Sequence, residues 1–186
     1  MMRRGFKAEA ARRALEIRAE FGLSPTDPFD PYTYFSEYGI PVVEISTLEV
    51  GVRRVLYSES RDKISGALLP LGNGFVVIDN GFHALTRRRS TAAHECAHHV
   101  LEHEFAASIS ASSRACGLGK AQEDEATLLS GELLIPSHAA RSHAVSNWSD
   151  RDVAEAYGVS VPFATWRMNA SGARKVAQAV QRRRSA

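Results

Sequence analysis

One short stretch of the chain carries side chains that could hold a metal ion and activate water. It runs from Thr91 to His103 and contains the pattern His-Glu-x-x-His at His94, Glu95 and His98. Residues four apart lie on one face of a helix, so both imidazoles can bind the same ion. Glu95 lies about 100° further round the helix. That position suits a general base acting on a metal-activated water, which is the chemistry of metal-assisted hydrolysis.

The simpler interpretation of the same stretch is an amphipathic helix whose histidines are satisfied within the fold. The context favours the metal site, because an apolar arc lies beside the face that carries His94 and His98. The histidine pair is therefore expected at the rim of the core. The arc consists of Ala93, Cys96, Ala97, Val100 and Leu101.

A catalytic zinc site needs a third protein ligand and one open position. A second helix is expected from residue 123 until Pro136 stops it. Glu125 and Glu132 share one of its faces with leucines, and a carboxylate in such surroundings is costly to bury without a cation beside it. The spacing alone does not choose between these two glutamates.

Three segments together resemble the ImmA/IrrE family of zinc metallopeptidases. They are the run from Arg89 to His99, the Glu123-x-Glu125-Ala126 segment, and Leu133-Leu134-Ile135-Pro136. In that family a Thr-Ala-His-Glu-x-x-His helix is followed by a Glu-x-Glu-Ala helix that ends in Leu-Leu-Met-Pro. The resemblance implies His94 and His98 as metal ligands, Glu125 as the third ligand and Glu95 as the catalytic base.

The resemblance also implies a fold, a cofactor and a substrate. The fold would be α+β and zincin-like, with a small antiparallel sheet packed on helices and a helix-turn-helix-like pair after it. The activity would be that of a gluzincin-like zinc metalloendopeptidase, although manganese would accept the same ligands. The substrate class would be a helix-turn-helix transcriptional repressor, cut in a stress response or to induce a phage or other mobile element.

Two other classes of function stay open. One is a non-catalytic, metal-stabilised DNA-binding regulator, whose closed site would take a fourth protein ligand such as His103, His138 or Cys116. The other is a toxin or sensor whose peptidase activity needs a partner. Coordination number separates the first alternative from a peptidase.

The composition predicts one cytoplasmic domain over residues 1–186. Of these residues, 44% are hydrophobic, and no apolar run approaches a membrane span or a signal peptide. The net charge is +2, with basic residues gathered at both ends. Few aromatic residues interleave them, so solvated helix faces are favoured over direct nucleic-acid binding. Two cysteines make no disulfide framework; Cys96 is expected to be buried, and a redox role for Cys116 is a hypothesis.

The pattern along the chain predicts helices within residues 1–40, a sheet over 41–79 and metal-site helices over 88–136. Strands are expected at 41–46, 52–57, 64–69 and 75–79, in an antiparallel sheet. The Gly72-Asn73-Gly74 turn pairs the last two strands directly. A Gly-rich loop is expected at 106–120. A peptide substrate is expected to add to the 75–79 strand or its neighbour.

A helix, a glycine turn and a second helix are expected over 149–172, opened by a capping box at Ser149 and Asp152. Bulky Pro162, Phe163 and Trp166 favour packing over reading a DNA groove. A donor to the oxyanion is also needed, and the sequence does not choose among six candidates. They are His103, His138, His143, Tyr32, Tyr34 and Arg167.

Overall fold

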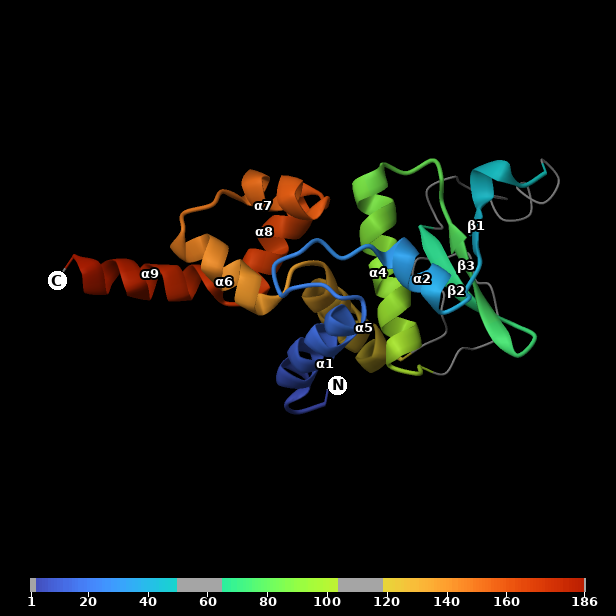
Figure 1. Cartoon of the computed structure of the whole chain (residues 1–186), viewed down its shortest axis with the longest axis horizontal. Helices are drawn as coiled ribbons and strands as arrows, with labels where there is room; N and C mark the ends of the chain where they lie inside the picture. Colours follow the sequence, from blue (N-terminus) through green and yellow to red (C-terminus); the bar gives the residue numbers. More distant parts are fainter. Residues whose placement is uncertain (1–2, 50–64, 104–118, 186) are drawn as a thin grey trace. The chain divides into compact units, whose positions relative to one another are not determined.

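The computed structural model divides into two compact units, and helix α5 (Lys120–Leu134) contributes residues to both. The first unit comprises Met1–Arg4 and Asp30–Ser130, and the second comprises Gly5–Phe29 and Gly131–Ala186. The structure describes residues 3–49, 65–103 and 119–185. Helices with a small sheet confirm the α+β class (Figure 1). A single domain over 1–186 stays a prediction.

The sheet of the first unit has the order β1-β3-β2. Strands β2 (Gly66–Leu71) and β3 (Gly74–Asp79) form the predicted antiparallel hairpin, with Gly72 at φ 60° in its turn. Strand β1 (Val42–Glu44) pairs with the other edge of β3 and runs parallel to it. The sheet is therefore mixed and not wholly antiparallel: the hairpin with β2 leaves one edge of β3 open, and β1 takes that edge in the parallel direction. The strand expected at 52–57 lies outside the described residues.

This order decides which strand can receive a peptide. Strand β3 covers the predicted 75–79 strand and is paired along both edges, with β1 on one side and β2 on the other. An extra strand therefore has to pair with a neighbour of β3. Of these neighbours, β2 also packs on the helix that carries His94 and His98.

Two helices pack in the first unit beside this sheet. Helix α2 (Pro31–Glu37) starts at an Asp30 cap with proline in its first turn, and it packs on α4 (Leu85–Val100). Helix α4 in turn packs on β2 and β3 (Figure 1). Its buried residues include Ala93, Cys96 and Ala97 of the predicted apolar arc, which confirms the burial of Cys96, whereas Val100 and Leu101 of that arc are half-buried. A short 3-10 turn, Ile45–Thr47, follows β1.

The close approach of β2 to α4 depends on a glycine. A Cβ atom added at Gly66 would lie 2.6 Å from Thr91 Cγ2 and 3.1 Å from the Ile78 carbonyl oxygen. Only a residue without a side chain lets the strand approach the helix this closely. This approach puts β2 next to the His-Glu-x-x-His segment.

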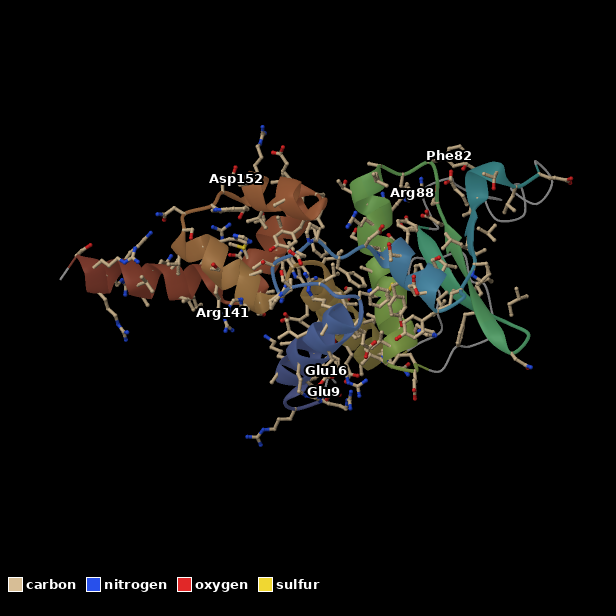
Figure 2. All side chains as sticks on the ribbon, viewed as in Figure 1. Glu9, Glu16, Phe82, Arg88, Arg141 and Asp152 are labelled. Atoms are coloured by element: carbon tan, nitrogen blue, oxygen red, sulfur yellow. The ribbon has the colours of Figure 1, made fainter. Side chains whose placement is uncertain are left out.

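An ionic network fastens the start of α4 to the sheet. Arg88 (Figure 2) donates to the buried Asp79 carboxylate on β3 at 2.6 Å and to Glu44 on β1 at 2.7 Å. The Tyr32 hydroxyl donates to the same Asp79 carboxylate at 3.0 Å. Hydrogen bonding to Asp79 raises the pKa of Arg88 above its ordinary value, so this cation stays charged. The network ties α2, β1 and β3 to the helix that carries the histidines.

The second unit is helical. It contains α1 (Phe6–Glu20), α6 (Ser137–Val145), α7 (Asp150–Tyr157), α8 (Val161–Ala170) and α9 (Ala173–Arg184). The predicted capping box of Ser149 and Asp152 opens α7 (Figure 2), and Gly158 at φ 62° ends it before α8. The predicted helix, turn and helix are thus confirmed. Among the described residues, no helix combines the length and the apolar character needed to cross a bilayer.

Candidate metal centre

The two histidines of the His-Glu-x-x-His pattern face one point from adjacent turns of α4. The Nε2 atoms of His94 and His98 are 3.0 Å apart, and their ring centroids are 4.6 Å apart. The His98 side chain is fully buried, whereas that of His94 keeps 25% of its exposure. The expected pairing of the imidazoles follows from helical spacing and from the buried apolar face beside them.

Helix α5 brings a carboxylate to this point, and it is that of Glu123. One Glu123 oxygen lies 3.2 Å from His94 Nε2, and the other lies 3.6 Å from His98 Nε2. The three side chains offer ligand atoms that all lie within 4.8 Å of one another. Tetrahedral zinc with bonds of about 2.0–2.1 Å holds its ligand atoms roughly 3.3 Å apart. The donor types and their separations therefore fit zinc.

Glu125, the third ligand implied by the resemblance, points elsewhere. Its carboxylate accepts from Arg3 Nε at 3.0 Å and lies 3.9 Å from His103 Nε2. Two residues along a helix turn the side chain by about 200°, so Glu123 and Glu125 cannot face the same point. The structure thus places Glu123, and not Glu125, beside His94 and His98.

Glu132, the other glutamate considered for this role, caps the next helix. Its two oxygens accept from the Ser137 backbone N–H at 2.8 Å and from the Ser137 hydroxyl at 2.6 Å. The buried Arg167 guanidinium lies 2.5 Å from the same carboxylate. Both oxygens of Glu132 are therefore engaged within the second unit.

A sequence signal for Glu123 existed. Glu123 precedes Ala126 by one helical turn, and Ala126 is fully buried. Glu125, by contrast, is followed one turn later by the larger Leu128. The apolar face shared by Glu125, Leu128 and Glu132 concealed this signal.

Glu95 is held against the edge of the sheet. It is 3% exposed, and one carboxylate oxygen accepts the backbone N–H of Leu68 on β2 at 2.9 Å. Burial raises the pKa of Glu95 above its ordinary value, an effect that the neighbouring His94 partly offsets. A carboxylate with a raised pKa is suited to taking up a proton near neutral pH.

The two histidines differ in proton affinity. Burial, and then the charge of His94, lower the pKa of His98 to about 3, so His98 is neutral. Burial alone would lower the pKa of His94, but the hydrogen bond to Glu123 and the charges of Glu95 and Glu123 outweigh burial and raise it. The hydrogen bond from His94 in turn lowers the pKa of Glu123. Without metal, the Glu123 carboxylate therefore stabilises a proton on His94.

Among the described residues, three side chains bring ligand atoms together at this point: His94, His98 and Glu123. Of the candidates for a fourth protein ligand, His103 lies against the opposite nitrogen of the His98 ring, Nδ1, at 2.8 Å. His138 is exposed on α6, in the second unit. Cys116 and the Gly-rich stretch before α5 lie outside the described residues.

The two tyrosines considered as oxyanion donors in the first unit have their hydroxyl groups in hydrogen bonds. The Tyr32 hydroxyl bonds Asp79, and the buried Tyr34 hydroxyl lies 2.6 Å from His99 Nδ1. In the second unit, Arg167 donates to the Ile135 carbonyl at 2.8 Å. Because Arg167 is also buried, it is a structural group. His143 lies 2.9 Å from the Tyr157 hydroxyl and stacks on Trp148.

The sequence was compared with known protein families and with curated proteins. The family described as Peptidase_M78, the IrrE N-terminal-like domain, matches residues 35–169. The chain belongs to this family. The matched M78 region contains α4 and the whole of α5, and hence every residue of the metal centre. Membership of the M78 family supports a metallopeptidase-type domain. A comparison with curated proteins gave no match.

Proposed function

We propose that the protein is a metal-dependent endopeptidase whose ion is held by His94, His98 and Glu123. The observation that carries this proposal is the convergence of two imidazole nitrogens from α4 and a carboxylate from α5 within 4.8 Å of one another. Nitrogen and oxygen donors in this number suit zinc, and manganese is the alternative ion. The M78 membership of the chain supports the same class of reaction.

The residues around the centre have distinct roles in this proposal. A bound zinc ion would polarise the scissile carbonyl and lower the pKa of its water to about 7 from 15.7. Glu95 takes up the proton of the attacking water and passes it to the leaving amine. The Leu68 N–H, 2.9 Å from the Glu95 carboxylate, holds this base in place. Burial of His98 keeps its imidazole neutral and able to bind.

Strand β2 is the proposed docking edge for the substrate. It packs on α4 and carries the Leu68 N–H that points at Glu95, so a peptide added along this edge would run past the base. Backbone hydrogen bonds would supply affinity in such an arrangement. We propose a helix-turn-helix repressor as the substrate class, in a stress response or in the induction of a mobile element; this rests on the family resemblance.

Replacement of the base separates metal binding from chemistry. Glu95→Gln keeps the side-chain volume and an oxygen that accepts from Leu68, so zinc content should match that of the wild type. Cleavage of the repressor should fall by about 10²–10⁴-fold, because proton transfer is lost. The matched control is Glu37→Gln, an exposed position on α2. Cleavage at the wild-type rate by Glu95→Gln would remove Glu95 from the mechanism.

The substrate class has its own test. A repressor encoded next to this gene would be incubated with wild-type and Glu95→Gln proteins, and its products identified by mass spectrometry. We expect one new pair of fragments with the wild type alone. Intact repressor together with cleavage of an unrelated protein would contradict the repressor as substrate while leaving the peptidase in place.

A further inference from the structure

The end of α4 folds a third histidine back onto the candidate metal ligand His98. The His103 backbone N–H donates to the His98 carbonyl at 3.2 Å, and the Glu102 N–H donates to the His99 carbonyl at 3.1 Å. Glu102 has φ 50°, the left-handed conformation that usually falls to glycine at this position. These bonds form a Schellman motif. The left-handed conformation costs free energy for a residue with a side chain, and this turn requires it of Glu102.

A Schellman motif commonly brings two apolar side chains together, one in the last turn and one after it. Here those two positions hold His98 and His103. Their Nδ1 atoms are 2.8 Å apart, and their ring planes meet at 64°. Both residues are buried, at 0% and 7% exposure. The contact is therefore a hydrogen bond between two buried imidazoles.

The direction of this hydrogen bond follows from the metal centre. His98 presents Nε2 to His94 and Glu123, so a metal-binding His98 carries its proton on Nδ1. That N–H needs an acceptor, and His103 Nδ1 is the atom in place. His103 accepts there when its own proton is on Nε2, which faces the Glu125 carboxylate at 3.9 Å.

Glu125 is itself held as an anion. It is 6% exposed and accepts from the Arg3 backbone N–H at 3.4 Å and from Arg3 Nε at 3.0 Å. A buried carboxylate on this side attracts the His103 proton to Nε2. The three side chains therefore form a series. The Glu125 carboxylate, held by Arg3, faces His103 Nε2, and His103 Nδ1 contacts Nδ1 of the candidate metal ligand His98. Such outer partners orient a ligand ring and fix its tautomer.

We propose that His103 is a positioning residue, which fixes His98 with Nε2 free for metal, and that Glu125 orients His103. This inference rests on the proposed metal site. It also gives Glu125 a role outside the ligand set. The alternative is that His103 merely fills space at the end of α4.

The test is zinc affinity, measured by competition with a chromophoric chelator. His103→Phe keeps a ring of similar size but has no acceptor, so affinity should fall by about 10–100-fold. The stability of the metal-free protein should stay close to that of the wild type, because the ring still packs. His103→Gln, whose amide oxygen can accept from Nδ1, should recover part of the affinity. The control is His138→Phe, at an exposed position on α6.

A double-mutant comparison tests the outer carboxylate. Glu125→Gln should weaken zinc binding in the wild type and have no further effect in His103→Phe, because the two residues act in series. Glu123→Gln should weaken binding far more than either. If Glu125→Gln costs as much affinity as Glu123→Gln, Glu125 is a ligand and the series is wrong.

The tautomer gives a readout that packing alone would not move. In the zinc-loaded wild type, ¹⁵N NMR should show a protonated His98 Nδ1 that exchanges slowly with water, and in His103→Phe the same proton should exchange faster. Wild-type zinc affinity and exchange in His103→Phe would overturn the positioning role alone. Failure of the wild-type protein to bind zinc would instead overturn the proposed function.

Discussion

Glu95 on α4 and Leu68 on β2 are joined by a hydrogen bond of 2.9 Å, from the backbone N–H of the strand to the buried carboxylate of the helix. Leu68 stands opposite Val77 of β3, and the Val77 N–H points away from β2 to bond the Pro41 carbonyl. Leu68 and Val77 therefore do not bond each other, and the Leu68 N–H points away from β3. The proposed base and the proposed docking edge are thus one connected feature. Burial of the Glu95 carboxyl group in its ionised form costs free energy, and this burial raises its pKa.

That cost predicts a stability gain for Glu95→Gln. The folded pKa of Glu95 is raised above 4.5, so ionisation at neutral pH disfavours the fold. Metal-free Glu95→Gln should therefore unfold at higher urea concentration than the wild type at pH 7. The difference should shrink as pH falls, and close below about 4.5, where both states of the wild type are protonated. A variant less stable than the wild type at pH 7 would contradict this.

Gly66 sets the approach of β2 to α4. A methyl group at this position would meet Thr91 Cγ2, so Gly66→Ala should cost about 1–3 kcal/mol of stability and lower cleavage by displacing Leu68 from Glu95. Thr91→Ser removes that methyl group. The double variant Gly66→Ala with Thr91→Ser should recover part of the loss in urea unfolding. Equal stabilities for the single and double variants would show that the contact with Thr91 is not the cause.

Zinc binding should release a proton. The hydrogen bond to Glu123 helps to raise the pKa of His94, whereas His98 is already neutral. Metal must displace the proton on His94, so about one proton should leave near pH 6.5, and affinity should fall as pH is lowered. Calorimetry in two buffers of different ionisation enthalpy measures this number. A binding enthalpy that is the same in both buffers would refute it.

Arg88 neutralises Asp79, which is 2% exposed. Arg88→Ala leaves this carboxylate buried without its cation, and we expect a loss of about 3 kcal/mol in the free energy of unfolding. Asp79→Asn in the same chain should restore part of that loss. Arg87→Ala, whose side chain bonds Ser65 at the surface, is the control and should change stability by less than about 0.5 kcal/mol.

Local patterns predicted most of the elements. The helices expected within residues 1–40 are α1 and α2, and the Gly72-Asn73-Gly74 turn correctly joins β2 to β3. These features depend on periodicity and turn chemistry within a few residues. The parallel pairing of β1 with β3 depends on contacts far apart in the sequence. No local pattern encodes that pairing, so the all-antiparallel sheet was a wrong expectation.

The sequence correctly predicted the part of the site that lies on a single helix, α4. Spacing along α4 correctly brought His94 to His98, because both ligands lie on the same rigid element. The choice between Glu123 and Glu125 depends on how α5 is rotated against α4, which the shared face of Glu125 with leucines did not reveal. The contact of Glu95 with Leu68 involves a backbone N–H, which the identity of a residue does not signal.

Anomalous diffraction at the zinc edge, from crystals of the zinc-loaded protein, tests the account most directly. We expect one strong peak within about 2.0–2.2 Å of His94 Nε2, His98 Nε2 and a Glu123 carboxylate oxygen, with no fourth protein atom at that distance. A peak bound by Glu125 in place of Glu123, a fourth protein ligand, or zinc located away from the two histidines would contradict it.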